Sequence, residues 1–145
     1  MKSYYLLNTN RKLDPEGIDE QTMLAEGIAT AYMTPWKNEI KNINSGDIVF
    51  LYRVEEGVIA FGEATSKLCS RNYRKDFRLK NEEFYKKLKN FQIISDCPIS
   101  AKEINHLTSE RVSFQKTLIK VSTDLGEALL HECKKKVALN SKQAA

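Results

Sequence analysis

Two short runs rich in β-branched and aromatic residues stand near the middle of the chain, separated by a polar turn. The first run covers residues 48–53, the second covers residues 58–65, and Glu55-Glu56-Gly57 lies between them. Two such runs joined by a short turn predict an antiparallel β-hairpin, with Gly57 where the loop needs a positive φ. Because both faces of each run are mostly apolar, we expect the hairpin to be covered on both sides.

Strict alternation assigns the side chains of this hairpin to two faces. In the first strand, one face carries Ile48, Phe50 and Tyr52, and the other carries Val49, Leu51 and Arg53. In the second strand, one face carries Val58, Ala60, Gly62 and Ala64, and the other carries Ile59, Phe61, Glu63 and Thr65. A glycine inside a strand, here Gly62, indicates a bulge or a close approach of another backbone.

The same patterning predicts the elements on either side of the hairpin. Before it we expect a strand over residues 3–8, a loop over 9–17, a helix over 19–31 and a short helix that starts near Pro35. After it we expect an irregular segment over 66–80, a helix over 81–89 and a strand over 91–95. There follow a helical turn near Ile104, a last strand over 117–121, a helix over 124–139 and a frayed tail over 140–145.

Length and composition match one globular domain, and we assign residues 1–145 to a single domain. The chain has 145 residues, of which 41% are hydrophobic and 29% charged, which allows a real core and is unlike a disordered chain. The formal net charge of +4 permits an anionic partner without requiring one. No apolar stretch approaches the roughly 20 residues of a membrane span, and we find no signal peptide.

The chain has three cysteines, Cys69, Cys97 and Cys133, which are far apart in the sequence and odd in number. This spacing indicates neither a disulfide framework nor a Cys-rich metal site. We therefore expect free thiols, no metal and a cytoplasmic location. The sequence does not indicate an oligomeric state.

Catalytic motifs are lacking in the sequence. His106 and His131 are the two histidines, and neither stands near a Cys, Ser or Asp at a spacing that forms a local motif. Neither GxxxxGK[ST] nor GxGxxG occurs, so no glycine-rich loop is predicted to bind phosphate. We expect a protein that is not an enzyme and uses no cofactor; a hydrolase would need a cluster that assembles in space around His106.

Basic and aromatic residues alternate over residues 66–91, which we call the basic segment. Lysine and arginine neutralise phosphates, and exposed aromatic rings stack on unpaired bases. On this hypothesis the phosphate contacts are Arg71, Arg74 and Lys75. The alternative is that Tyr73, Phe77 and Phe84 pack the segment onto the body of the protein while its cations are merely solvated.

Several stretches of the chain resemble PUA-like domains of the EVE type. These stretches are the opening run Tyr4-Tyr5-Leu6-Leu7-Asn8, the Gly46-Asp47 turn with the hairpin after it, and the closing segments at Arg111-Val112-Ser113-Phe114 and 117–121. Trp36 stands about where an aromatic residue precedes the Gly-Asp turn in that family. The resemblance implies an α+β fold, a PUA-like partly open β-barrel of about five to six strands flanked by helices.

The resemblance also implies a pocket, which would be formed by Asn8, Trp36, Tyr52 and Arg53. The aromatic rings would stack on a flat base, while the amide and the guanidinium would read its polar edge. Arg111 would face a phosphate or form a structural salt bridge. From the residues alone, Trp36 is explained as a core residue, and Tyr52 as a buried tyrosine whose hydroxyl has a partner.

The predicted function is therefore a module that binds DNA or RNA and holds a modified base in an aromatic pocket, without chemistry of its own. Two alternatives remain open. One is a small-molecule binder that uses the same pocket for a nucleoside-like ligand. The other is a protein-interaction module without a pocket, which would use residues 66–91 as a docking surface. A closed barrel mouth with a fully buried Trp36 would favour it.

Overall fold

The computed structural model of the protein describes residues 2–11 and 13–144. Within this part, the chain forms in order β1 (Tyr4–Asn8), α1 (Ile18–Glu26), β2 (Ile28–Tyr32), the 3-10 helix η1 (Trp36–Asn42), β3 (Ile48–Arg53) and β4 (Gly57–Ala64). There follow β5 (Cys69–Arg71), the 3-10 helices η2 (Tyr73–Lys75) and η3 (Phe77–Leu79), β6 (Glu83–Ile93), α2 (Ala101–Leu107), β7 (Leu118–Val121) and α3 (Thr123–Ala144). The fold is α+β, as predicted.

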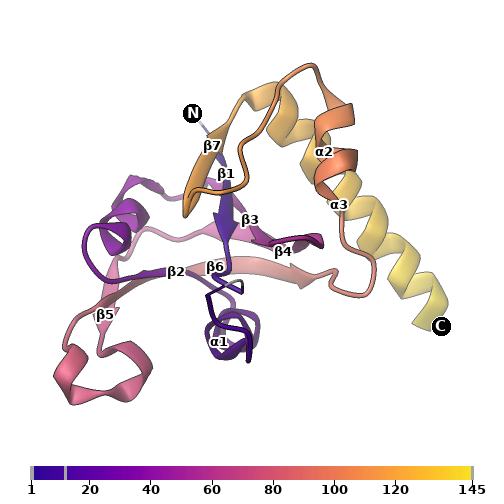
Figure 1. The fold of residues 1–145 in the computed structure, drawn as a ribbon. Helices are drawn as coiled ribbons and strands as arrows, with labels where there is room; N and C mark the ends of the chain where they lie inside the picture. Colours follow the sequence, from indigo (N-terminus) through magenta and orange to yellow (C-terminus); the bar gives the residue numbers. More distant parts are fainter. Residues whose placement is uncertain (1, 12, 145) are drawn as a thin grey trace.

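One curled sheet forms the body of the protein (Figure 1). Its strands lie in the order β2-β6-β4-β3-β1-β7, and β5 adds to β6. β1 runs parallel to β3, whereas the other neighbouring strands are antiparallel. β2 and β7 stand at opposite ends of this order and do not pair within the described chain, so the barrel is partly open.

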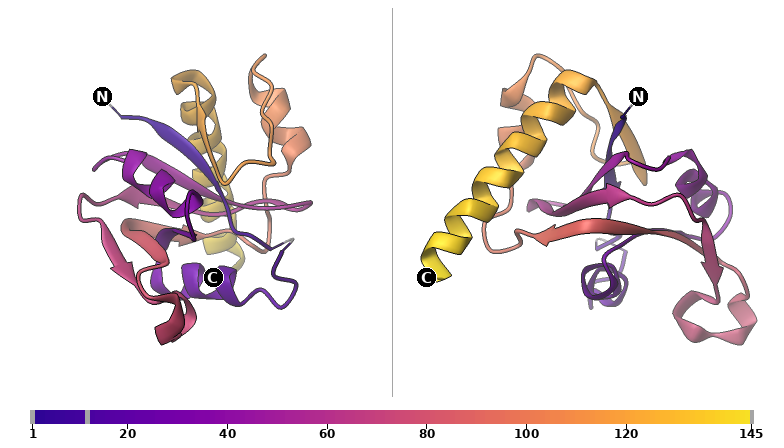
Figure 2. Two further views of the ribbon diagram at one scale, coloured as in Figure 1. Left: turned by 60° about the vertical axis from the view of Figure 1, so that its left-hand side comes forward. Right: turned by 180° about the vertical axis from the view of Figure 1, so that it is seen from behind.

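Two hydrophobic clusters cover the two faces of the central strands. One lies under α2 and α3 and includes Phe50, Ile104 and Leu129. The other lies under α1 and η1 and includes Met23 and Leu51. Figure 2 shows α3 running along one side of the sheet while α1 lies on the other. The prediction of a hairpin covered on both faces is therefore confirmed.

The hairpin has the predicted turn and one unpredicted bulge. Gly57 has a φ of 126°, and a Cβ there would lie 2.1 Å from the Ile99 carbonyl oxygen, so glycine is required. The bulge lies close to this turn in the β3–β4 ladder. Leu51 pairs with Ala60 and Tyr52 pairs with Val58, which leaves Ile59 as an extra residue in β4. Strict alternation was therefore wrong for β4, because the bulge places Ile59 and Ala60 in the same cluster.

A second irregularity follows at Gly62, as predicted. The β4–β6 register shifts between Phe61 and Glu63, and a Cβ on Gly62 would lie 2.9 Å from the Cβ of Leu88. The two strands thus approach closely at this point.

One predicted helix is shorter in the structure, and another is a strand. The helix predicted over 19–31 ends at Glu26, and after Gly27 the chain continues as β2. The 11-residue strand β6 (Glu83–Ile93) replaces most of the helix predicted over 81–89 and includes the start of the strand predicted over 91–95. It pairs with β2, β4 and β5. Pairing with three strands outweighs the helix propensity of its lysines, and the buried Lys86 ammonium donates to the Ile43 carbonyl.

Other boundaries also differ from the expectation. The segment predicted as irregular over 66–80 contains β5, η2 and η3. α3 continues through the backbone region predicted as a frayed tail and ends at Ala144, while residue 145 lies outside the described residues. No helix in the described part of the chain has the length and apolar character that crossing a membrane requires.

Candidate ligand pocket

A cavity of about 780 Å³ opens beside the ends of β1, β2 and β3, and we call it the aromatic cavity. Its walls come from segments far apart in the sequence: the chain after β1, the β2–η1 connection, β3, η2 and the loop before β7. The lining residues are Asn8, Asn10, Leu13, Thr30, Ala31, Tyr32, Met33, Trp36, Tyr52, Val54, Tyr73, Phe114, Gln115 and Thr117. None of these described residues has a charged side chain.

Aromatic rings dominate the walls. Trp36 is 52% exposed, so its indole is accessible from the cavity and from solvent. Tyr52 stacks on Phe114 with ring centroids 4.6 Å apart and an interplanar angle of 20°. Tyr32 and Tyr73 form a second pair, with centroids also 4.6 Å apart and a tilt of 41°. Such walls suit a flat, uncharged ligand that buries its two faces.

Polar groups in the cavity come mainly from amides and hydroxyls. Asn8 accepts a hydrogen bond from the Asn10 backbone N–H at 2.9 Å, and its Nδ2 donates to the Phe114 carbonyl at 3.5 Å. The Tyr32 hydroxyl is buried and has no partner among the described residues. Burial raises the pKa of Tyr32, and the nearby Asp19 and Glu83 carboxylates raise this pKa further. The phenol therefore stays protonated in neutral solution.

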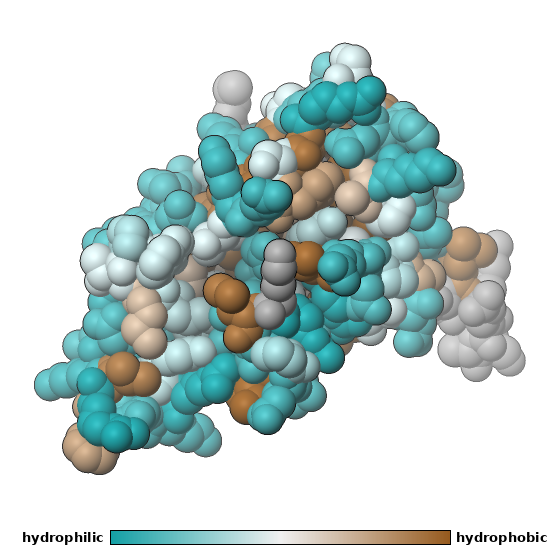
Figure 3. All heavy atoms as spheres, viewed as in Figure 1, coloured by the Kyte–Doolittle hydropathy of each residue, from teal (hydrophilic) through white to brown (hydrophobic). Residues whose placement is uncertain are grey.

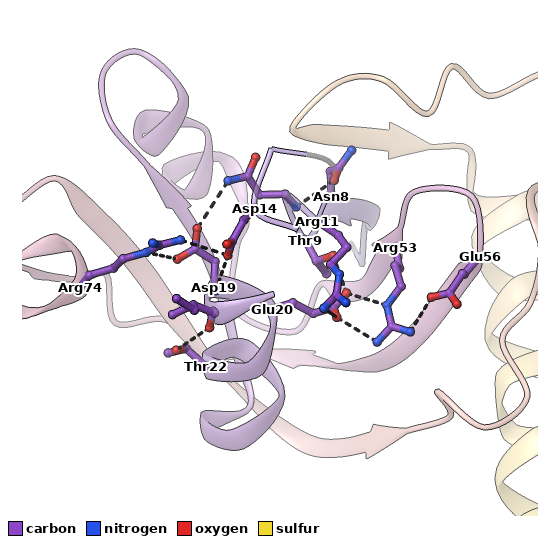
Figure 4. A network of polar contacts seen from close by, with 12 residues as sticks. Asn8, Thr9, Arg11, Asp14, Asp19, Glu20, Thr22, Arg53, Glu56 and Arg74 are labelled. Atoms are coloured by element: carbon purple, nitrogen blue, oxygen red, sulfur yellow. Dashed lines mark hydrogen bonds and ion pairs between the residues drawn. The ribbon is translucent and has the colours of Figure 1, made fainter. Parts of the chain in front are cut away.

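Arg53 lies apart from the other three residues that the sequence assigned to a pocket. Asn8, Trp36 and Tyr52 line the aromatic cavity, whereas Arg53 does not. Its Nε and Nη2 donate to the two Glu20 oxygens at 2.9 Å each, and it also pairs with Glu56 (Figure 4). Neighbouring residues of β3 face opposite sides of the sheet, so Tyr52 and Arg53 point away from each other.

The arginines of the basic segment are held by carboxylates. Arg71 pairs with Glu83 at 2.9 Å and with Glu26 at 2.8 Å. Arg74 pairs with Asp14 at 3.0 Å and with Asp19 at 3.1 Å. These four contacts compensate both guanidinium charges, and they lower the net positive charge available to a phosphate.

The remaining predicted phosphate contacts are exposed. Lys75 forms no ion pair with the residues that the structure describes. Arg111 donates to the Asn105 carbonyl at 3.3 Å and stands three residues before the cavity residue Phe114. Of the aromatic residues in the basic segment, Tyr73 lines the cavity and Phe84 packs on the core. Phe77 is 81% exposed, and apolar side chains reach the surface at the lower left of Figure 3, over η2 and η3.

Sequence reasoning did not assign three aromatic residues that the structure places in the cavity. These are Tyr32, Tyr73 and Phe114. The sequence does indicate a role for two of them. Phe114 stands in the closing segment that resembles EVE domains, and Tyr73 is one of the aromatic residues of the basic segment. The sequence has no such signal for Tyr32, because its apolar spacing predicts a helix where the structure has β2.

Neither histidine belongs to the cavity. His106 and His131 are exposed on α2 and α3. The described residues contain no group of three or more His, Cys, Asp and Glu side chains placed to hold a metal ion.

The fold has counterparts among solved structures, although no protein-family model and no curated protein matches the sequence. The YTH domain of Mmi1 in complex with RNA is 10% identical, with a TM-score of 0.61 and coverage of 96% of this chain and 82% of that chain. The ASCH protein of Zymomonas mobilis is 13% identical, with a TM-score of 0.56 and coverage of 88% and 94%. A protein from Agrobacterium tumefaciens is 17% identical, with a TM-score of 0.53 and coverage of 92% of both chains.

These likenesses concern the fold. They show that the chain has the PUA-like architecture, the partly open barrel that the sequence predicted.

Proposed function

We propose that this protein binds nucleic acid and holds one unpaired base in the aromatic cavity. The observation that carries the proposal is the cavity itself, which combines five aromatic residues with amides and hydroxyls and has no charged lining residue among those described. Aromatic faces stack on any base, and each stacked base typically contributes about 1–3 kcal/mol. The phosphates and sugars would stay outside, where cations are exposed.

A modified base fits this proposal better than an unmodified one. The cavity volume of about 780 Å³ leaves space beyond a single planar ring system. An added methyl or similar group would contact apolar side chains such as Val54 and Met33, and burial of such a group is favourable by about 0.8 kcal/mol per CH₂. The base would reach the cavity from a single strand or by flipping out of a duplex.

In this proposal, exposed lysine and arginine side chains near the cavity contact the phosphates. Lys75 directly follows the two residues Tyr73 and Arg74 of η2, and Arg111 belongs to the same loop as Phe114. Their charge would supply affinity that does not depend on base sequence. One solved structure with this fold, the YTH domain of Mmi1, contains RNA, which is consistent with the same use of the fold here.

A free nucleoside or another flat metabolite is the second candidate. The volume of the cavity lies within the range of small-molecule pockets, and the pairing of Arg71 and Arg74 with carboxylates weakens the case for a phosphate-binding surface. A fully buried Trp36 would have favoured the protein-interaction alternative, and the exposed indole does not give it that support.

Titration of Trp36 fluorescence tests the proposal, because this is the single tryptophan of the chain. Single-stranded DNA and RNA oligonucleotides and free nucleosides are added at low and high salt. We expect a change with oligonucleotides that weakens as salt rises, since phosphate contacts release counterions. A response to nucleosides alone would favour the second candidate, and no response to any of them would overturn both.

A further inference from the structure

Asp19 is a buried carboxylate that connects two sides of the aromatic cavity. It lies in the first turn of α1 and is 3% exposed. Its Oδ2 accepts hydrogen bonds from the Tyr73 hydroxyl at 2.7 Å and from Asn10 Nδ2 at 3.4 Å. Its Oδ1 accepts one from Arg74 Nε at 3.1 Å. Tyr73 and Asn10 line the cavity, so one carboxylate holds a ring in one wall and an amide in another.

Arg74 compensates two carboxylates at this point (Figure 4). Besides its bond to Asp19, its Nη2 lies 3.0 Å from Asp14 Oδ2. The same Asp14 oxygen accepts a hydrogen bond from the Asp19 backbone N–H at 2.9 Å. Two buried carboxylates this close repel each other unless a cation lies between them. The Arg74 guanidinium therefore pairs with both carboxylates, while 38% of its side-chain surface stays exposed.

The backbone of Arg74 supports a role for its side chain. Arg74 has a φ of 53° and Lys75 has a φ of 62°, so two successive non-glycine residues adopt the left-handed conformation. Glycine adopts this conformation at a lower free-energy cost than arginine. An arginine at position 74 is thus unfavourable for the backbone, and the contacts of its guanidinium with Asp14 and Asp19 offset that cost.

We propose that Asp19 and Arg74 are positioning residues of the aromatic cavity, which hold the Tyr73 ring in the wall where a base binds. The proposal rests on the proposed function for its binding readout. Arg74 neutralises Asp19, Asp19 accepts the Tyr73 hydroxyl, and the ring then packs against Tyr32 at a fixed position. Arg74 consequently influences the base without a phosphate contact, which reverses the role that the sequence suggested for it.

The variant Arg74→Gly separates the two roles of Arg74. It removes the guanidinium and relieves the left-handed backbone, so the turn keeps its conformation. A positioning role predicts that the affinity for free ribonucleosides falls about tenfold, and that the slope of log K against log salt for a single-stranded RNA oligonucleotide is unchanged. A slope reduced by about one with unchanged nucleoside affinity would identify a phosphate contact and overturn the proposal.

Arg78→Ala is the matched control. Arg78 is also in the basic segment, pairs with Asp76, and has a side chain that is 77% exposed. Because it does not touch the Asp19 cluster or the cavity, its loss should leave nucleoside affinity at the wild-type value. A tenfold loss in Arg78→Ala as well would mean that the effect is one of general charge and not of position.

A double-mutant cycle tests whether Arg74 acts through the Tyr73 hydroxyl. Tyr73→Phe keeps the ring and removes the hydrogen bond to Asp19, and it should reduce nucleoside affinity by about as much as Arg74→Gly. If both act on the same ring position, the double variant should bind no more weakly than either single variant. Losses that multiply would show that the two residues act independently, which contradicts the proposal.

The positioning role also has a readout that needs no ligand. In the wild-type protein, NMR of labelled tyrosine should show slow flipping of the Tyr73 ring, and Arg74→Gly or Asp19→Asn should accelerate it, whereas Arg78→Ala should not. Unchanged ring dynamics in both variants would overturn the positioning role. A wild-type protein that binds neither nucleosides nor oligonucleotides but shows these changes would refute the proposed function alone.

Discussion

The ring of Tyr52 lies flat against the ring of Phe114, with centroids 4.6 Å apart and planes inclined by 20°. Tyr52 comes from the middle of the sheet in β3, and Phe114 comes from the loop that precedes β7. The pair therefore joins the rigid floor of the aromatic cavity to its least regular wall. A stacked aromatic pair of this kind contributes about 0.5–1.5 kcal/mol beyond its buried area.

The first prediction concerns this pair. Phe114→Ala should lower the affinity for a nucleoside or a single-stranded oligonucleotide about tenfold, because it removes one aromatic wall. Tyr52→Phe is the control, since it keeps the stacked ring and loses only the hydroxyl. Calorimetric titration of both variants measures the difference. Equal affinities of the wild-type protein and Phe114→Ala would show that this wall does not touch the ligand.

The second prediction separates binding from stability at Trp36. With half of its surface exposed, Trp36→Ala should change the free energy of unfolding by about 1 kcal/mol or less. The same variant should lose much more binding free energy than this. It should also lose the selectivity between modified and unmodified bases. Urea denaturation and fluorescence anisotropy with labelled oligonucleotides provide the two values. Phe77→Ala, an exposed aromatic outside the cavity, should change neither.

The third prediction assigns Arg53 to stability. Arg53→Ala leaves the Glu20 carboxylate, 2% exposed, with two described partners: the Thr9 hydroxyl, which donates to it at 2.8 Å, and the longer 3.5 Å ion pair with Arg11. Loss of one partner from a buried ion pair lowers the free energy of unfolding by about 3–5 kcal/mol. We expect a loss of about 3 kcal/mol, because Arg11 still compensates part of the Glu20 charge. Nucleoside affinity, measured below the melting temperature, should be unchanged.

Two further variants bracket this result. Glu56→Gln removes the exposed partner of Arg53 and should cost less than about 1 kcal/mol. Arg53→Met combined with Glu20→Gln should recover part of the lost stability, because the buried charge is gone. If Arg53→Ala abolishes nucleoside binding in a fully folded protein, the assignment to stability is wrong.

The fourth prediction concerns alkaline pH. Burial raises the pKa of the Cys133 thiol, and the nearby Glu132 raises this pKa further. Above the unfolded-state pKa of about 8.5, the unfolded chain releases this proton while the folded protein keeps it. The unfolded state then binds fewer protons, so stability must fall as pH rises, by up to about 1.4 kcal/mol per pH unit for this group.

Cys133→Ala isolates the contribution of the thiol. The variant loses packing at every pH, yet it no longer carries the titrating group. The difference in unfolding free energy between wild type and variant should therefore shrink from pH 8 to pH 10, as measured by urea denaturation. Parallel curves over this range would contradict the assignment to Cys133.

The fifth prediction places a phosphate contact at Lys75. Lys75→Gln should reduce the slope of log K against log salt for a single-stranded oligonucleotide by about one, with no change in nucleoside affinity. Lys135→Gln serves as the control, because Lys135 lies on α3 and pairs with Glu132. An unaltered slope in Lys75→Gln would remove this lysine from the binding surface.

Local pattern was sufficient for the hairpin, and the resemblance to EVE-type domains indicated three residues that line the cavity. The alternation of side chains along β3 determines which hydrophobic cluster each apolar residue joins. The same alternation places Tyr52 and Arg53 on opposite faces of the strand, so they are not expected to line one pocket. The strands β2 and β6 could not be predicted in this way. The lysine-rich β6 is a strand because three neighbours pair with it, which no local pattern contains.

The hydrogen bonds among polar residues next to the cavity also could not be predicted from sequence spacing. Asp19 and Tyr73 are 54 residues apart, as are Thr30 and Phe84, and their contacts depend on the complete sheet. Sequence alone predicts that a basic residue such as Arg74 faces solvent, because its carboxylate partners Asp14 and Asp19 are far away in the chain. The distribution of charge therefore indicated an anionic partner more strongly than the assembled surface does.

The place of β1 between β3 and β7 determines the order in which the cavity can be completed. Asn8, near the start, donates its backbone N–H to the Thr117 carbonyl at 2.9 Å, and Phe114 covers Tyr52 from the same late segment. During synthesis on the ribosome, about a hundred residues emerge before this segment does. A nascent chain therefore exposes the Tyr52 ring and an unpaired edge of β1, and the aromatic cavity is complete only after residues 114–117 have emerged.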